Sequence, residues 1–148
     1  MKIRPLQKKD ICAAAAIAGR NYSKTDEASS ARELRSMWSD AAIKPTYYVA
    51  EEKARVVGFA GYMQSWMDYC VYQIFWVNVA PEYQGSGIGT KLVKTIIRAI
   101  RKNDEAALIE LTVAAKDARY YAKHFGFKKL TSFSRPTDFL MSLSLEKK

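Results

Sequence analysis

The pattern of apolar and polar residues changes its period near the middle of the chain. Residues 70–79 are apolar or aromatic apart from Gln73 and Asn78, which predicts a strand that is covered on both faces. From residue 88 to 102, apolar residues recur every three or four positions and basic residues fill much of the opposite side, which predicts an amphipathic helix. The stretch between them is short and rich in glycine. We therefore expect a strand, a glycine-rich loop and a helix N-terminus in succession.

The rest of the chain predicts further strands and helices around this unit. Expected strands cover residues 2–6, 47–51, 55–66, 69–79, 107–113, 127–133 and 138–145. Expected helices cover residues 10–20, a stretch that begins at Ser29 or Ser30 and ends before Pro45, and residues 88–102 and 117–125, with loops at 21–27 and 134–137. Strands 69–79 and 107–113 should be parallel because a helical crossover joins them. The pattern predicts one mixed α/β domain over residues 1–148.

The glycine-rich loop has the features of an anion-binding site. Gly85, Gly87 and Gly89 would let the backbone approach a phosphate, and the first turn of the next helix offers unpaired N–H groups and partial positive charge. A Walker loop would end in Gly-Lys-Ser/Thr, but Gly89 is followed by Thr90 and then Lys91. A dinucleotide fingerprint would place its third glycine at position 90. Neither nucleotide motif fits, and a tight turn without a ligand is the alternative.

Residues 84–89 read Gln-Gly-Ser-Gly-Ile-Gly and follow Val-Asn-Val-Ala-Pro-Glu-Tyr at 77–83. This combination closely resembles the coenzyme A pyrophosphate loop of the GNAT superfamily of N-acetyltransferases, and the expected order of elements agrees over nearly the whole chain. The resemblance implies a mostly antiparallel central sheet of about seven strands, flanked by four helices, with a splayed parallel pair at its centre. It also implies acetyl-CoA as co-substrate and no metal.

The resemblance assigns cofactor contacts residue by residue. The backbone of Val77 and Val79, with Asn78 between them, would hold pantetheine and the thioester carbonyl. The pyrophosphate would lie against Gln84, Gly85, Ser86, Gly87, Ile88, Gly89 and Thr90. Lys116, near the start of the helix at 117–125, is a further candidate for a phosphate or the pantetheine amide.

The general acid of the family is often a Tyr that lies four residues before the glycine of a late Gly-Phe pair. Here the pair is Gly126-Phe127, and Ala122 stands at that position. One helical residue is a rotation of about 100°, so the neighbouring Tyr121 is the first candidate and Tyr120 the second. Packing at the sheet edge is the alternative role for both.

The general base and the acceptor pocket have several candidates. Glu110, Asp68 or a water chain without a dedicated carboxylate could take the amine proton. The aromatic residues that could line an acceptor pocket are Tyr22, Tyr62, Trp66 and Trp76, although core packing explains each equally well.

Composition and charge bear on the class of partner. The two cysteines, Cys12 and Cys70, are far apart and His124 is the single histidine, so neither a disulfide framework nor a metal site is expected. The apolar residues 11–18 are too few to span a bilayer, and a cytoplasmic protein is expected. A net charge of +9 suggests a nucleic-acid binder or a basic surface that attracts an anionic ligand. The basic residues are dispersed, which favours the second interpretation.

Together these features predict an acetyl-CoA-dependent N-acetyltransferase. It would act on a primary amine of a small molecule or protein, by direct transfer within a ternary complex. The alternative, motivated by Ala122, is an acyl-CoA-binding or regulatory domain without catalysis. Many relatives dimerise, so the resemblance leaves a homodimer open.

Overall fold

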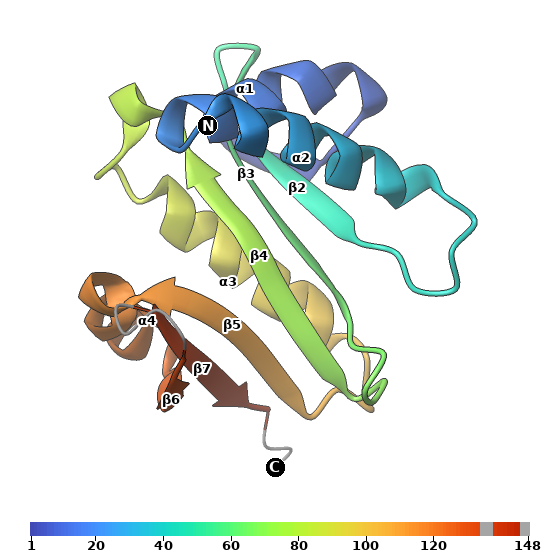
Figure 1. Cartoon of the computed structure of the whole chain (residues 1–148), viewed down its shortest axis with the longest axis vertical. Helices are drawn as coiled ribbons and strands as arrows, with labels where there is room; N and C mark the ends of the chain where they lie inside the picture. Colours follow the sequence, from blue (N-terminus) through green and yellow to red (C-terminus); the bar gives the residue numbers. More distant parts are fainter. Residues whose placement is uncertain (134–137, 146–148) are drawn as a thin grey trace.

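A single sheet runs through the computed structural model, which describes residues 1–133 and 138–145 (Figure 1). Its strands are β1 (Lys2–Pro5), β2 (Thr46–Glu52), β3 (Arg55–Gln64), β4 (Val71–Val79), β5 (Leu108–Ala114), β6 (Lys128–Ser132) and β7 (Asp138–Ser144). Its α-helices are α1 (Ile11–Asn21), α2 (Lys24–Arg35), α3 (Ile88–Arg101) and α4 (Ala118–Phe125). Short 3₁₀ segments are η1 (Lys8–Asp10), η2 (Ser36–Trp38), η3 (Pro81–Tyr83) and η4 (Ala115–Asp117). No helix among the described residues has the length and apolar character needed to cross a bilayer.

The strand order is β1-β2-β3-β4-β5-β7-β6, and every neighbouring pair is antiparallel except β4 and β5. This confirms the predicted sheet, with seven strands in the described residues and one parallel pair at its centre. The turn predicted at 134–137 lies outside the described residues.

The parallel strands β4 and β5 are paired at only one end. Residues 71, 72 and 73 of β4 lie opposite residues 108, 109 and 110 of β5. Beyond Gln73 and Glu110 the register stops, and Figure 1 shows the two strands diverging toward the glycine-rich loop. The predicted splay is therefore confirmed, and it exposes one edge of β4 in the middle of the sheet.

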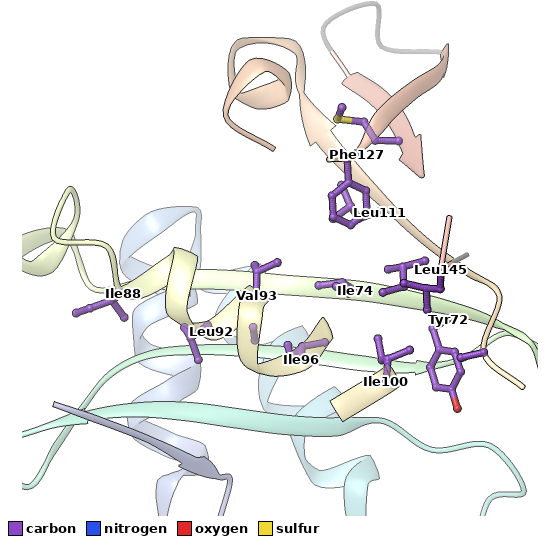
Figure 2. Close-up of a cluster of buried hydrophobic side chains, with 14 of the residues drawn as sticks. Tyr72, Ile74, Ile88, Leu92, Val93, Ile96, Ile100, Leu111, Phe127 and Leu145 are labelled. Carbon is purple, nitrogen blue, oxygen red and sulfur yellow. The ribbon is translucent and has the colours of Figure 1, made fainter. Parts of the chain in front are cut away.

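Two apolar clusters hold helices against the sheet. Leu92, Ile96 and Ile100 of α3 are almost fully buried in one cluster with residues of β4 and β5 (Figure 2). Ala14, Ile17 and Ala18 of α1, with Leu34 of α2, belong to the second cluster, on strands β2 and β3. The amphipathic pattern of 88–102 therefore fixes which face of α3 meets the sheet.

Helix α2 begins earlier than the sequence pattern indicated. The prediction placed residues 21–27 in a loop, but α2 starts at Lys24. Ser23 caps it, because its hydroxyl oxygen accepts a hydrogen bond from the Asp26 N–H at 3.2 Å. The prediction was wrong because most residues of α2 are polar and obscure its apolar period. The Ser-x-x-Asp cap at its start was the sequence signal for this helix. As a result, α1 and α2 are joined by only two residues, Tyr22 and Ser23.

Strand β4 has a bulge where it pairs with β3. The β3–β4 register shifts between Phe59 and Gly61, and Trp76 on β4 has a positive φ of 52°. A Cβ on Gly61 would lie 2.5 Å from the ring of Tyr47, so this position requires close backbone approach. The bulge lies three residues beyond Gln73, the last residue of β4 that pairs with β5.

Candidate active site

The diverging ends of β4 and β5 bound a cleft of about 1450 Å³. Its walls come from β4, the glycine-rich loop, the last residues of β5, the start of α4 and the end of α1. The predicted residues that line it are Val77, Asn78, Val79, Gln84, Gly85, Gly87, Ile88, Gly89, Thr90, Lys116, Tyr120 and Tyr121. The splay thus brings together segments that are far apart in the sequence.

The edge of β4 that faces the cleft carries backbone donors. The Ala80 N–H donates to the Val57 carbonyl on β3 at 2.8 Å. Because N–H groups alternate in direction along a strand, those of Val79 and Val77 point toward the open edge instead. The β5 register ends at Glu110, so β5 does not pair with these two residues. The arrangement leaves two N–H groups available for a ligand carbonyl.

The glycine-rich loop is shaped for a bound anion. Gly85 and Gly87 have φ values of 80° and 84°, a conformation that strongly favours glycine. A Cβ on either residue would meet nothing within 4 Å among the described residues, so the space beside the loop is open. Gly87 is the N-cap of α3, whose first-turn N–H groups and dipole favour negative charge. These observations fit a phosphate.

Two predicted loop side chains are engaged with the protein itself. Ser86 donates its hydroxyl to the Tyr83 carbonyl. The Gln84 amide nitrogen, Nε2, donates to the Val79 carbonyl and to Asn21 Oδ1, each at 3.1 Å. Both side chains therefore hold the loop in shape, which leaves phosphate contacts to the backbone.

The two adjacent tyrosines of α4 have different surroundings. Tyr121 is half-buried, with its ring 6.1 Å from that of Phe127. Burial raises the pKa of the Tyr121 phenol well above its ordinary value of 10.0, and the neighbouring Tyr120 and Asp117 raise that pKa further. Tyr120 is more exposed, and its hydroxyl is hydrogen-bonded to Thr90 on α3. Tyr121 therefore presents a protonated phenol at neutral pH.

The candidate bases from the sequence lie away from the cleft. Glu110 is opposite Gln73 at the paired end of the two strands. Asp68 lies in the turn before β4, where its carboxylate accepts from the Cys70 N–H at 2.9 Å. Among the described residues that line the cleft, the carboxylates are instead Asp26 and Asp117. Sequence reasoning missed both, and only the Ser23 cap could have located Asp26.

Of the four aromatic candidates for an acceptor pocket, two line the cleft and two do not. Tyr22 and Trp76 line the cleft, with ring centroids 6.4 Å apart. The Trp76 indole N–H donates to Glu33 of α2, which orients the ring. Tyr62 stacks on Tyr48 at 6.5 Å in the core, outside the cleft. Trp66 is 67% exposed near the turn before β4, also outside the cleft.

No metal-binding group of side chains is found in the part of the chain that the structure describes. Within it, no three His, Cys, Asp or Glu side chains are grouped so that they could hold an ion.

One protein family matches most of the chain. The model of the "Acetyltransferase (GNAT) family" matches residues 13–127. No curated protein matches the sequence. A GNAT-family protein of Desulfovibrio desulfuricans is similar in structure, with a TM-score of 0.83, 18% identity, and coverage of 98% of this chain and 99% of that one.

Two further solved structures carry functional names. The PaiA N-acetyltransferase of Thermoplasma acidophilum, in complex with coenzyme A, has a TM-score of 0.71 at 18% identity, covering 97% of this chain and 98% of that one. The ribosomal-protein-S18-alanine N-acetyltransferase of Escherichia coli has a TM-score of 0.76 at 19% identity, covering 99% and 95%. At these identities the likeness shows the fold. Because the family model spans residues 13–127, the chain belongs to the acetyltransferase (GNAT) family and is an acyltransferase.

Proposed function

We propose that this protein transfers the acetyl group of acetyl-CoA directly to a primary amine of a small molecule or protein, within a ternary complex. One observation carries the proposal. The splay of β4 and β5 leaves the N–H groups of Val77 and Val79 unpaired by β5, in a cleft that Tyr121 also lines.

The cofactor would lie along the open edge of β4. Its pyrophosphate would meet the N-terminus of α3 at Gly87, where the loop leaves open space. Pantetheine and the thioester carbonyl would accept hydrogen bonds from Val77 and Val79. The exposed Lys116 lines the same cleft and would add positive charge near the phosphates.

The chemistry needs an oxyanion donor and two proton movements. The amine nitrogen attacks the thioester carbon, and the resulting oxyanion is stabilised by the backbone donors of β4. The carbon–sulfur bond then breaks, and Tyr121 gives its proton to the leaving thiolate. The amine proton leaves through water or to Asp117, which lines the cleft.

Direct transfer is supported by the positions of the thiols. Cys12 is exposed on α1, and Cys70 precedes β4 at the paired end of the strands. Neither is among the described residues that line the cleft. An acetylated cysteine intermediate would therefore need a thiol that the cleft lacks.

The test is release of free thiol from acetyl-CoA across a panel of primary amines. In Tyr121→Phe we expect kcat to fall about 100-fold, while the Kd for coenzyme A stays unchanged because the ring is retained. Because the pKa of Tyr121 is raised above 10.0, its deprotonation should not reduce the wild-type rate below that pH. Tyr120→Phe is the matched control, with a smaller effect expected on kcat.

Two outcomes would overturn the proposal in different ways. Binding of acetyl-CoA without thiol release for any amine would favour the non-catalytic acyl-CoA-binding alternative. An unchanged kcat in Tyr121→Phe would remove Tyr121 as the general acid, even if transfer is observed.

A further inference from the structure

Two side-chain amides meet at one backbone carbonyl beside the cleft, and a third amide is bonded to one of them. The Val79 carbonyl accepts from Asn21 Nδ2 at 3.0 Å and from Gln84 Nε2 at 3.1 Å. Asn21 Nδ2 also donates to Asn78 Oδ1 at 2.9 Å, and Asn21 Oδ1 accepts from Gln84 Nε2 at 3.1 Å. We call Asn21, Asn78 and Gln84 the amide triad.

The Val79 carbonyl fixes the orientation of the side-chain amide groups. A carbonyl can only accept, so the atoms of Asn21 and Gln84 that face Val79 must be the amide nitrogens. The other end of Asn21 is then Oδ1, which accepts from Gln84, and the Asn78 atom facing Asn21 must be its oxygen. This leaves Asn78 Nδ2 buried without a partner among the described residues. In this orientation Asn21 keeps all three of its hydrogen bonds, to Asn78, to the Val79 carbonyl and to Gln84.

Asn21 lies between two functional parts of the cleft. It is the last residue of α1, and the next residue, Tyr22, is 63% exposed, with its ring centroid 6.4 Å from that of Trp76. Gln84 is the first residue of the glycine-rich motif. The triad is therefore a short polar link from the loop to the two-residue connection between α1 and α2.

We propose that Asn21 is a positioning residue that couples the coenzyme A loop to the Tyr22 side of the cleft. The inference rests on the proposed function, in which the loop holds the pyrophosphate. By holding Gln84, Asn21 keeps the loop in its phosphate-binding shape. Because coupling between sites is reciprocal, coenzyme A on the loop also orders Tyr22 and the start of α2.

The test combines affinity with hydrogen–deuterium exchange, using coenzyme A as the probe. Titration calorimetry on Asn21→Ala should show a Kd about tenfold weaker than wild type, as expected for loss of hydrogen bonds of this kind. In the wild type, saturating coenzyme A should slow exchange both at 84–90 and at 22–26. In Asn21→Ala, protection at 22–26 should be lost, while protection at 84–90 remains.

The control is Arg20→Ala, which removes an exposed ion pair between the same two segments. Arg20 and Glu82 are 51% and 53% exposed, so their pair should contribute little. We expect Arg20→Ala to keep both the Kd and the exchange pattern of the wild type. This separates the triad from a general loosening of the end of α1.

A double-mutant cycle asks whether Asn21 and Gln84 act as a unit. If they do, and each single variant weakens binding of coenzyme A about tenfold, the double variant Asn21→Ala with Gln84→Ala should also weaken it about tenfold and not about 100-fold. Independent, multiplying effects, or wild-type exchange at 22–26 in Asn21→Ala, would overturn the inference. If the wild type itself does not bind coenzyme A, the proposed function fails, and that result is distinct from failure of the triad alone.

Discussion

The two ends of the β4–β5 pair are built from the same two strands and have different roles. At the paired end, Tyr72 and Ile109 lie opposite each other in register, and both are buried. At the open end, Val79 and Val113 have no partner across the gap in the described register, and both line the cleft. At the paired end, backbone N–H groups bond to the neighbouring strand. At the open end, the corresponding N–H groups of β4 are therefore free to bind a ligand.

This difference shows that the site depends on an interruption of the regular pairing between β4 and β5. The bulge at Trp76 bends β4, and the glycine-rich loop begins soon after that bend. The paired end keeps the two strands in position, so the open end holds its geometry without hydrogen bonds between the strands. Stability and ligand binding should therefore respond to different substitutions.

The largest expected effect is obstruction of the open end. Gly87→Trp places an indole in the open space beside the loop, at a residue with φ of 84°. We expect the Kd for acetyl-CoA to weaken by at least about 1000-fold, and the increase in Tm on adding acetyl-CoA to disappear. Calorimetry and thermal unfolding check this.

The control for backbone strain at Gly87 is Gly126→Ala. Gly126 also has φ of 84°, at the end of α4 and outside the described cleft lining. This variant should lower stability and still bind acetyl-CoA. Equal loss of binding in both variants would contradict the role of the loop.

The second effect is on the paired end. Ile109 is 0% exposed, so Ile109→Ala should lower the free energy of unfolding by about 3 kcal/mol. Urea unfolding measures this change. The Kd for coenzyme A should stay the same, because Ile109 is not among the described residues that line the cleft. A matching loss of affinity would show that the two ends are not separable.

The smallest effect should come from a carboxylate at the paired end. Glu110→Gln should change kcat by less than about twofold, whereas loss of a true general base costs about 100-fold or more. Steady-state kinetics at saturating acetyl-CoA measure it, with Asp117→Asn as the matched carboxylate substitution at the open end. A large loss in Glu110→Gln alone would identify Glu110 as the base.

Local patterns predicted most of the elements but not all of them. The strand–loop–helix unit at 70–102 combines period, glycine spacing and charge, and each of these depends only on neighbouring residues. Helix α2 was placed too late because much of its surface is polar and its cap is a single side chain. That Tyr121 and Asp117 both line the cleft could not be read from the sequence, because it depends on where α4 lies relative to β4.

By itself, the sequence determined the order of strands and helices, the family and the loop that would hold pyrophosphate. These follow from periodicity and from a motif whose residues are contiguous. Only the tertiary structure decided that Glu110 lies at the paired end, that Asp117 lines the cleft, and that Asn21 meets Gln84 across 63 positions. Such contacts join segments that are far apart in the sequence, so they depend on how the whole sheet and its helices pack and not on any local run of residues.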